Sequence, residues 1–332
     1  MSNDASRGMR LLEERDEPAF VALLREVYGE TYAYRALYEP GAVAALIRSG
    51  RAALWGDFDP AGRLLSHTGF LCKDPRGDYL ESGLSFRSSR AREGTPDAVV
   101  WARLFAWLEE RCVLVHQNTS TWHPLAQRYA ARYMRARPTG LIVDYVIGER
   151  LVGLAHPTTP MQALTMTSVV RPDRLPSPSH PRVVPRGPWG AWLAGVLREL
   201  GVEAIVASEG AASTRLGLDE IERNAALDLV RRAVTRAPAE VSLAAELAAP
   251  AARVDLLHLP CDDRMAAYPE LERAGYVPVG VRPHATRADE VILQRLPGAR
   301  RSEAMDALAA AELSPPGRAL VEGWRAVCAQ TT

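Results

Sequence analysis

Six prolines lie within residues 171–188, "RPDRLPSPSHPRVVPRGP", about halfway along the chain of 332 residues. Proline removes a backbone donor and fixes φ, so this density is incompatible with a long helix or a central strand. The chain is also roughly twice as long as a typical domain. The segment therefore predicts a linker between one domain at 1–170 and a second that begins near residue 189.

The two halves end with the same order of expected elements: strand, helix, strand, strand. This order lies between Val113 and Val170 in the first half and between Val254 and Leu296 in the second. The repeat is one of element order and not of residue identity. It predicts a mixed α/β (α+β) sheet in each half, with the second domain spanning 189–298. Two helices, over about 301–312 and 316–328, are expected in a C-terminal helical tail at 299–332.

Hydrophobic periodicity predicts the remaining elements of the first half. Asp16 is expected to cap a helix, and a shorter helix is expected over about 40–48. Thr95-Pro96-Asp97 is typical of the start of a further helix. Strands are expected in "RAALWGDFD", "RLLSHTGFLC" and "DYLESGLSF".

In the second half, alternating leucines favour a hairpin over about 214–234, followed by a helix that begins near Ala237. The hairpin has an alternative, because Ile221, Ala225 and Leu229 would also share one face of a helix.

Charge and cysteine content narrow the class of protein. Basic and acidic residues balance at 40 each, which argues against nucleic-acid binding or a membrane-surface role. Of the 40 basic residues, Lys73 is the one lysine. The sequence starts with no basic-then-apolar signal, and no apolar run is long enough to span a bilayer. The four cysteines form no CxxC motif, so a reduced, cytoplasmic protein is expected. No histidine pair has metal-ligand spacing, so no metal is expected.

Several phrases, taken in order, resemble the GCN5-related N-acetyltransferase (GNAT) superfamily. "YLESGLSF" and "GTPDAVVWARLFAWLEE" are similar to the family's fourth strand, pyrophosphate loop and following helix, and "HPLAQRYAARYM" to the helix after its fifth strand. "PELERAGYVPVGVRP" and "DEVILQRL" resemble the same ending in the second half. The resemblance covers about 10–170 and, more weakly, 185–297. It implies two GNAT-like domains in tandem, the second degenerate.

The resemblance implies an acyl-CoA site, for acetyl-CoA or another acyl-CoA, in the first half. The loop departs from the family, because only Gly94 remains of the glycines that close on a pyrophosphate. An ordinary basic turn, or a site for the arm of an acyl carrier protein, are the alternatives. The second half has no such loop, so one CoA per chain is expected. The expected cofactor-binding residues are Leu84, Ser85, Phe86, Arg87, Arg90, Arg92, Gly94 and Thr95.

The resemblance also implies catalytic roles. Glu81 matches the region of the family's base, and Tyr133, preferred over Tyr129, that of the acid for the thiolate. His123 starts the same helix and could lie at the mouth of the cleft. Backbone N–H groups of Ser85 to Arg87 would polarise the thioester carbonyl. The acceptor pocket is expected at Tyr28, Tyr32 and Tyr34.

Two functions remain open from the sequence. One is an acyltransferase that moves an acyl group, most often acetyl in this superfamily, from acyl-CoA to an amine of a small molecule. The other is a non-catalytic tandem protein that binds a ligand or a partner protein. The loss of loop glycines favours the second function, whereas Glu81 and Tyr133 favour the first.

Overall fold

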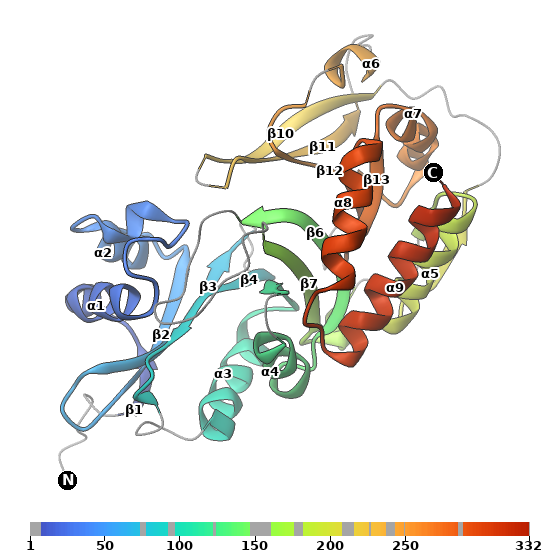
Figure 1. Ribbon diagram of the computed structural model, residues 1–332. Coiled ribbons are helices and arrows are strands. Elements are labelled where there is room, and N and C mark those ends of the chain that lie inside the picture. The colour runs from blue at the N-terminus through green and yellow to red at the C-terminus, as the bar shows by residue number, and fades with distance from the viewer. Residues whose placement is uncertain are drawn as a thin grey trace.

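The computed structural model forms one mixed α/β layer structure around a large sheet (Figure 1). It describes residues 8–73, 78–91, 97–121, 124–146, 161–175, 182–207, 216–225, 227–236, 243–248, 250–284 and 288–331. In these residues a 12-stranded sheet has the order β1-β2-β3-β4-β5-β7-β6-β13-β14-β12-β11-β10, and β8 and β9 form a separate pair.

The first half contains the expected helices and strands and one further strand, β1. Its elements are β1 (Gly8–Leu11), η1 (Glu14–Asp16), α1 (Glu17–Tyr28), η2 (Arg35–Tyr38), α2 (Ala42–Arg48), β2 (Ala52–Phe58), β3 (Leu64–Cys72), β4 (Tyr79–Arg87), α3 (Asp97–Arg111), β5 (Leu114–Ser120), α4 (Leu125–Tyr133), β6 (Arg137–Val146) and β7 (Met161–Val169).

Asp16 precedes α1 as expected, but the prediction that its side chain caps the helix is wrong. A capping residue needs extended backbone, whereas Asp16 is helical (φ −87°, ψ −3°) because η1 runs directly into α1. Its carboxylate instead accepts hydrogen bonds from Arg10 at 2.6 and 2.8 Å and from the Glu13 amide at 2.8 Å. Asp16 therefore ties β1 to the start of the helix.

The second part of the chain contains the expected hairpin, which is β10 and β11 paired antiparallel. The helix expected near Ala237 falls largely on residues outside the described ranges. The elements are η4 (Pro172–Arg174), β8 (Arg182–Val184), α5 (Pro188–Glu199), β9 (Ala204–Val206), β10 (Leu216–Asn224), β11 (Leu229–Arg236), α6 (Leu243–Glu246), β12 (Val254–Pro260), η5 (Asp263–Ala267), α7 (Tyr268–Arg273), β13 (Tyr276–Arg282), β14 (Glu290–Arg295), α8 (Gly298–Ala309) and α9 (Pro315–Gln330).

The strand pairing repeats between the two halves. In the first, β4 is parallel to β5, β5 antiparallel to β7 and β7 antiparallel to β6. In the second, β11 is parallel to β12, β12 antiparallel to β14 and β14 antiparallel to β13. Both β6 and β13 also have an irregularity at a Pro-x-Gly step, Pro138/Gly140 and Pro278/Gly280. The repeat expected from element order is thus present in the pairing.

The two halves of the sheet join where β6 meets β13, at the pair Gly140 and Gly280. A Cβ atom built on Gly140 would lie 2.6 Å from the Val279 carbonyl oxygen, and one on Gly280 would lie 2.5 Å from the Gly140 Cα. We call this contact between β6 and β13 the seam. Each glycine occupies the equivalent place in its half, so two equivalent glycines are paired there. Only glycine allows this approach of two backbones.

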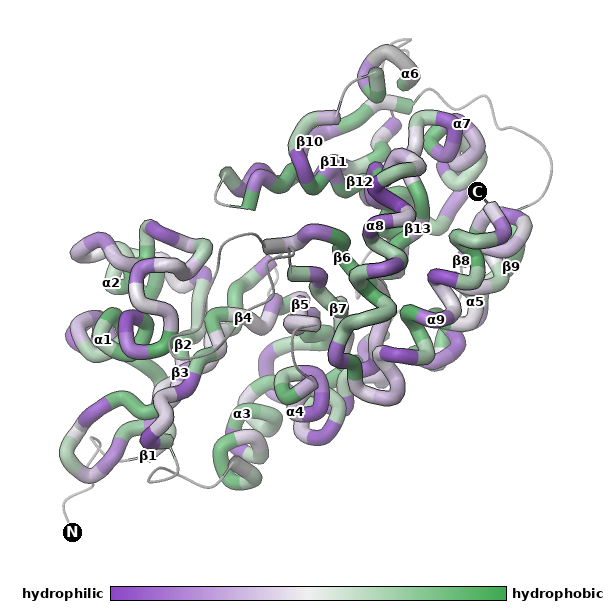
Figure 2. The backbone as a smooth tube through the Cα atoms, viewed as in Figure 1, coloured by the Kyte–Doolittle hydropathy of each residue, from purple (hydrophilic) through white to green (hydrophobic). Residues whose placement is uncertain are grey.

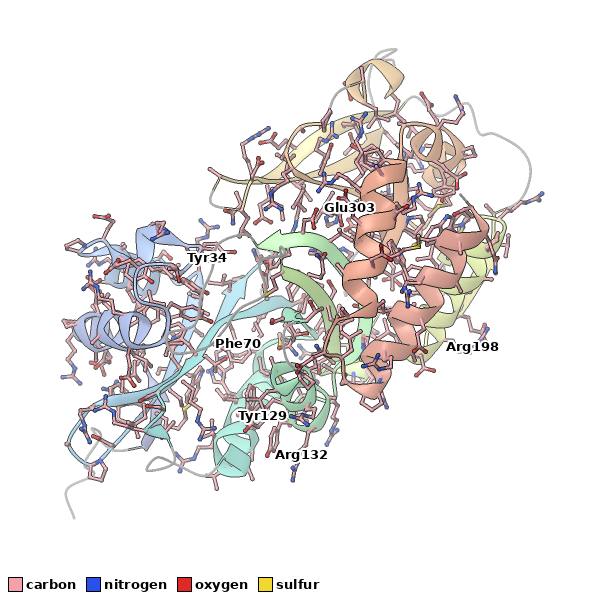
Figure 3. The ribbon with its side chains drawn as sticks, in the orientation of Figure 1. Tyr34, Phe70, Tyr129, Arg132, Arg198 and Glu303 are labelled. Atoms are coloured by element: carbon pink, nitrogen blue, oxygen red, sulfur yellow. The ribbon has the colours of Figure 1, made fainter. Side chains whose placement is uncertain are left out.

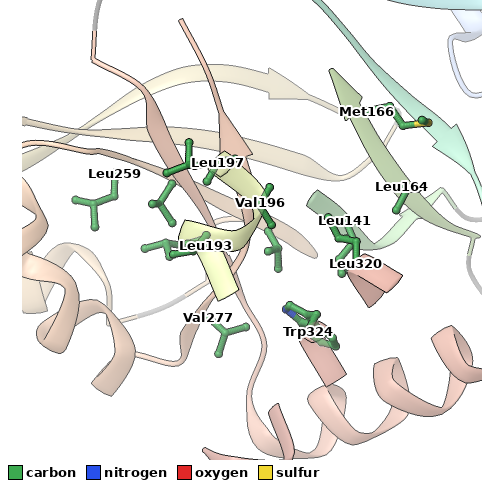
Figure 4. Packing of buried hydrophobic residues seen from close by; sticks show 14 of the residues in the cluster. Leu141, Leu164, Met166, Leu193, Val196, Leu197, Leu259, Val277, Leu320 and Trp324 are labelled. Carbon is green, nitrogen blue, oxygen red and sulfur yellow. The ribbon is translucent and has the colours of Figure 1, made fainter. Parts of the chain in front are cut away.

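One hydrophobic cluster includes residues of both halves and of the C-terminal helices (Figure 4). Leu141 and Leu164 belong to it, as do Leu193 of α5 and Trp324 of α9. The Trp324 indole donates a 2.8 Å hydrogen bond to the Pro278 carbonyl in β13. Both α3 and α9 mix hydrophobic with hydrophilic residues (Figure 2) and bury the former. Among the described residues, no helix is long and apolar enough to cross a membrane.

Candidate functional site

Two neighbouring parallel strands of the first half, β4 and β5, separate partway along their length. Their pairing runs from Tyr79–Leu114 to Ser82–Gln117 and ends there. Both strands continue, β4 to Arg87 alongside β3 and β5 to Ser120 alongside β7. The strands therefore separate beyond Ser82 and Gln117, and the edge of β4 from Gly83 onward is not paired with β5.

A bulge reshapes β4 just where the separation begins. Leu84 has a φ of +53°, a conformation that leucine rarely adopts, and the pairing with β3 shifts between His67 and Gly69. The His67 Nδ1–H donates to the Leu84 carbonyl at 2.6 Å, and the hydroxyls of Thr68 and Ser85 lie 2.6 Å apart. Burial lowers the pKa of His67 to about 4, so the ring is neutral at pH 7.

The bulge changes which side chains of β4 share a face. Leu80 packs in the cluster with Leu104 and Leu108 of α3, so its neighbour Glu81 points to the opposite face. Beyond the bulge, Leu84 and Phe86 pack in the cluster with Phe20 of α1. Glu81, Leu84 and Phe86 therefore lie on one face, that of α1.

Glu81 is a buried carboxylate near two cations, Lys73 and Arg231, and near His116. Its Oε2 lies 2.9 Å from the Lys73 Nζ, and 11% of the Glu81 side chain is exposed. Burial alone would raise its pKa, but Lys73, Arg231 and His116 together hold it at about 2. His116 is the residue opposite Glu81 on β5, and burial holds its pKa well below the ordinary value. Glu81 is thus ionised at pH 7.

The expected acceptor-pocket tyrosines gather on this same face. The ring centroids of Tyr28 and Tyr32 lie 4.8 Å apart and those of Tyr32 and Tyr34 lie 5.9 Å apart. Tyr28 and Tyr32 also contact Phe86, at 6.2 and 6.3 Å between centroids. Burial raises the pKa of Tyr34, with smaller effects from Tyr145, Glu81 and Arg231. Tyr34 and Glu81, which are far apart in the sequence, are therefore near one another in the fold.

The second half supplies a wall to the site. Arg231 of β11 is buried, and its Nη1 donates to the Glu222 carboxylate at 3.0 Å. Burial would lower the pKa of Arg231, whereas Glu81 and Glu222 raise it. Arg231 also lines a small cavity of about 20 Å³ with His116, His258 and Arg282. This cavity at the seam has room for about one water molecule.

On β5 and β6, Asn118 and Tyr145 extend the polar surface. The Asn118 amide donates to the Tyr145 hydroxyl at 3.5 Å and accepts from Thr165 at 3.0 Å. Burial, with Glu81, raises the pKa of Tyr145 to about 12, so its hydroxyl is neutral. The arrangement combines one carboxylate, one guanidinium and neutral hydroxyl donors around the separated strands.

The expected cofactor loop is described only in part. Arg87 donates to the Ala91 carbonyl at 3.2 Å, and Arg90 pairs with Glu26 of α1 at 2.9 Å. Ser88 also donates to Glu26, so this carboxylate fixes the first turn of the loop. The remaining expected residues, Arg92, Gly94, Thr95 and His123, lie outside the described residues.

Tyr129 lies on the other side of the sheet from Tyr34 (Figure 3), and Tyr133 is one turn further along the same helix. Both rings stack on Trp101 of α3, with centroids 6.4 and 6.0 Å away, and on each other at 5.5 Å. Both side chains are partly exposed, whereas Ala130 of the same helix faces the core. The tyrosines expected to serve as acid therefore belong to the α3–α4 surface, and Glu81 belongs to the opposite face.

Sequence reasoning missed Lys73, Arg231 and Tyr145. Lys73 had a signal, because it is the one lysine of the chain and follows the strand that precedes Glu81. Arg231 had none, since its part in the site depends on how the two halves meet. Tyr145 had none either, since its place beside Asn118 depends on the pairing of β5, β7 and β6.

Comparison with known proteins finds likeness only at the level of solved structures. No family model matches the chain, and no curated protein matches it either. One similar structure is a chimera of spermidine N-acetyltransferase from Vibrio cholerae and hSSAT, at 12% identity, 49% of this chain, 94% of that chain and TM-score 0.37.

Two others are acetyltransferases of different stated substrates. A phosphinothricin acetyltransferase from Sinorhizobium meliloti, solved with AcCoA, has 14% identity over 49% of this chain and 87% of its own, with TM-score 0.36. A ribosomal-protein-alanine N-acetyltransferase from Brucella melitensis has 16% identity over 48% and 98%, with TM-score 0.36. The solved structures similar to this chain are thus acetyltransferases of the GNAT type, matched over about half of its length.

Proposed function

We propose that the first half transfers an acyl group from an acyl-CoA, acetyl-CoA above all, to an amine of a small molecule. The observation that carries the proposal is the separation of β4 from β5 beside the bulge at Leu84, with Glu81 on the face of the tyrosine cluster. Acyl transfer to an amine needs a base, an oxyanion donor and a place for the thioester, and this region offers a candidate for each.

The residues present fit an acyl-CoA. The edge of β4 beyond Ser82 is not paired with β5, and an extended amide chain such as pantetheine can pair with a free strand edge. The amide groups that follow the bulge, Ser85 to Arg87, are the proposed donors to the thioester carbonyl. When bound, the thioester supplies the activated acyl carbon.

The chain's own groups divide the remaining work. Glu81 is ionised and would accept the proton of an acceptor ammonium, and Tyr28, Tyr32 and Tyr34 would shape the acceptor pocket. Tyr133, in preference to Tyr129, is proposed to return a proton to the CoA thiolate, and His123 to lie at the cleft mouth. The second half would form the far wall through Arg231.

One observation favours the second function, a non-catalytic binding protein. The Glu81 carboxylate already forms an ion pair with the Lys73 ammonium, and a carboxyl with a pKa of about 2 is a weak base. A protein that only binds a ligand would keep this pair intact throughout.

Calorimetry and a thiol-release assay separate the two functions. Acetyl-CoA, longer acyl-CoAs and free CoA are titrated into the full chain, and turnover is then followed with a panel of small amines. The proposal expects one CoA per chain and CoA release that depends on the amine. Tyr133→Phe should lower turnover by about 10²-fold without weakening acetyl-CoA, and Tyr129→Phe is its matched control.

Three outcomes decide against parts of the proposal. Binding without turnover would favour the non-catalytic function. Loss of activity in Tyr129→Phe alone would exchange the two tyrosines, and full activity in both variants would remove the tyrosine acid from the mechanism.

A further inference from the structure

We infer that Lys73 is itself an acyl acceptor, so that the chain acylates its own Lys73 side chain when it holds an acyl-CoA. This inference rests on the proposed function, since it needs an acyl-CoA between β4 and β5. It names a modification site, and it assigns a role to the ion pair that the proposed reaction leaves unexplained.

The position of Lys73 is that of an acceptor amine. Its Nζ lies 2.9 Å from the Glu81 carboxylate, the proposed base. The Lys73 amide donates to the Tyr79 carbonyl at 3.1 Å, which holds the residue beside β4 at the end of β3. Leu71 is paired with Glu81, and residues 71 and 73 share a face of an extended strand, so Lys73 approaches Glu81 from that face.

The residue type is the second observation. The chain has 40 basic residues and 39 of them are arginine, yet a lysine faces the buried carboxylate. An arginine would serve a purely structural pair at least as well, because its planar guanidinium binds a carboxylate bidentately. A guanidinium keeps its proton and is no nucleophile, whereas an ammonium that gives a proton to Glu81 becomes a free amine.

The step is balanced with an acyl-CoA as co-reactant. The Lys73 ammonium passes one proton to Glu81, and the amine nitrogen attacks the thioester carbonyl carbon. A C–N bond forms and the C–S bond breaks. The attacking nitrogen loses its second proton, the CoA sulfur takes one up, and CoA leaves as the thiol while Glu81 keeps the first proton. The products are Nε-acyl-Lys73 and CoA, and no oxidant or reductant is needed.

Mass spectrometry of the full chain after incubation with acetyl-CoA tests the inference. Acetylation adds one acetyl group and blocks trypsin at Lys73, which leaves a peptide from Leu64 to Arg76. Glu81→Gln should lower the rate of this modification by about 10²-fold, the lower end for loss of acid–base catalysis. Lys73→Arg should abolish it.

A second variant keeps the test valid even if Glu81→Gln does not fold. Arg198 of α5 is exposed (Figure 3), and Arg198→Lys places a reference lysine on the surface. Spontaneous acetylation follows exposure, and the Lys73 side chain is only 27% exposed. Enzymatic self-acylation therefore predicts that residue 73 is modified at least tenfold faster than residue 198 in the Arg198→Lys chain.

The outcomes separate the inference from the proposed function. Acetyl-CoA that binds and turns over with free amines while Lys73 stays unmodified overturns the inference alone. Modification of residues 73 and 198 at equal rates, or at equal rates in native and urea-unfolded protein, also overturns it. No binding of acetyl-CoA by calorimetry overturns both.

Discussion

The two halves of the sheet carry opposite charges at one equivalent position. From the Gly140–Gly280 pair, the register leads through Thr165 to Asn118 in the first half and through Ile292 to His258 in the second. Two residues before these, His116 is paired with Glu81 and Leu256 with Arg231. The Glu81 and Arg231 side chains are both buried, and each contributes to the pKa shift of the other. A repeated framework therefore carries a carboxylate in one half and a guanidinium at the equivalent position of the other.

The two halves also differ in the strand pairing and in the bulges beside these two charges. The pairing of β4 with β5 covers four residue pairs, and that of β11 with β12 covers five. Beside this parallel pairing, a bulge lies on β4, the strand of Glu81, in the first half, whereas in the second half a bulge lies on β10, between Glu220 and Glu222. The first half therefore has an irregular strand at its buried carboxylate, which fits the ligand site proposed there.

A buried network strengthens the second half at the matching place. Arg232, equivalent to Ser82, bonds the Asp255 carboxylate at 2.7 and 2.9 Å, and Tyr276 donates to the same carboxylate at 2.8 Å. These buried hydrogen bonds join β11 to β12 and β13. We therefore expect the second half to act as a fixed wall, which fits the proposal of one acyl-CoA site in the first half.

The largest expected effect concerns the two equivalent charges. Glu81→Gln should lower amine acylation by 10²- to 10⁴-fold, roughly the value of a general base. Arg231→Gln should cost less, about tenfold, and should move the acid limb of the pH–rate profile to higher pH. The reason is that Arg231 is one of the cations that hold the pKa of Glu81 at about 2. Equal losses with unchanged profiles would mean that the two charges act only as a structural pair.

The second effect is on stability in acid. The pKa of Glu81 falls from an ordinary 4.5 to about 2 on folding. Its contribution to the free energy of unfolding is therefore complete above pH 4.5 and is lost as the pH falls toward 2. That contribution is about 3 kcal/mol. Urea unfolding at pH 7, 4.5 and 3 should show the loss in the parent chain and a smaller one in Glu81→Gln. Parallel pH curves for the two proteins would contradict the assignment.

The smallest effect tests the seam that brings the halves together. Gly280→Ala and Gly140→Ala each place a methyl group within 2.6 Å of opposing backbone, and each should cost about 1–3 kcal/mol in urea unfolding. Gly195→Ala in α5 is the matched control, since nothing lies within 4 Å of its added methyl group. It should be neutral or stabilising by up to about 1 kcal/mol, because alanine favours helix. Equal free energies of unfolding for all three variants would show that the contact between β6 and β13 accommodates a methyl group at little cost.

Much of the fold could be predicted because its signals are local. The strands "DYLESGLSF" and "RVDLLHLP" and the helix start at Asp97 follow from side-chain periodicity and turn chemistry, and the structure has them. The prediction at Asp16 failed because a 3-10 turn, which depends on the packing of β1, had replaced the extended backbone of a cap. Strand β1 itself is four residues long and left no periodic signal.

The candidate site could be predicted only in part. Glu81 and Tyr34 were expected from a resemblance, and the structure brings both to one face; the roles assigned to them remain predictions. The bulge at Leu84 had no signal, because a leucine at positive φ is held there by the His67 bond and the β3 pairing and not by its own preference.

The sequence by itself determined the order of strands and helices and the placement of a single lysine before Glu81. Only the tertiary structure decided that Gly140 meets Gly280 and that Arg231 of the second half lowers the pKa of Glu81 in the first. The physical reason is the distance along the chain over which each interaction acts. Periodicity and capping act between residues a few positions apart, whereas burial of two charges 150 positions apart depends on where two sheets join.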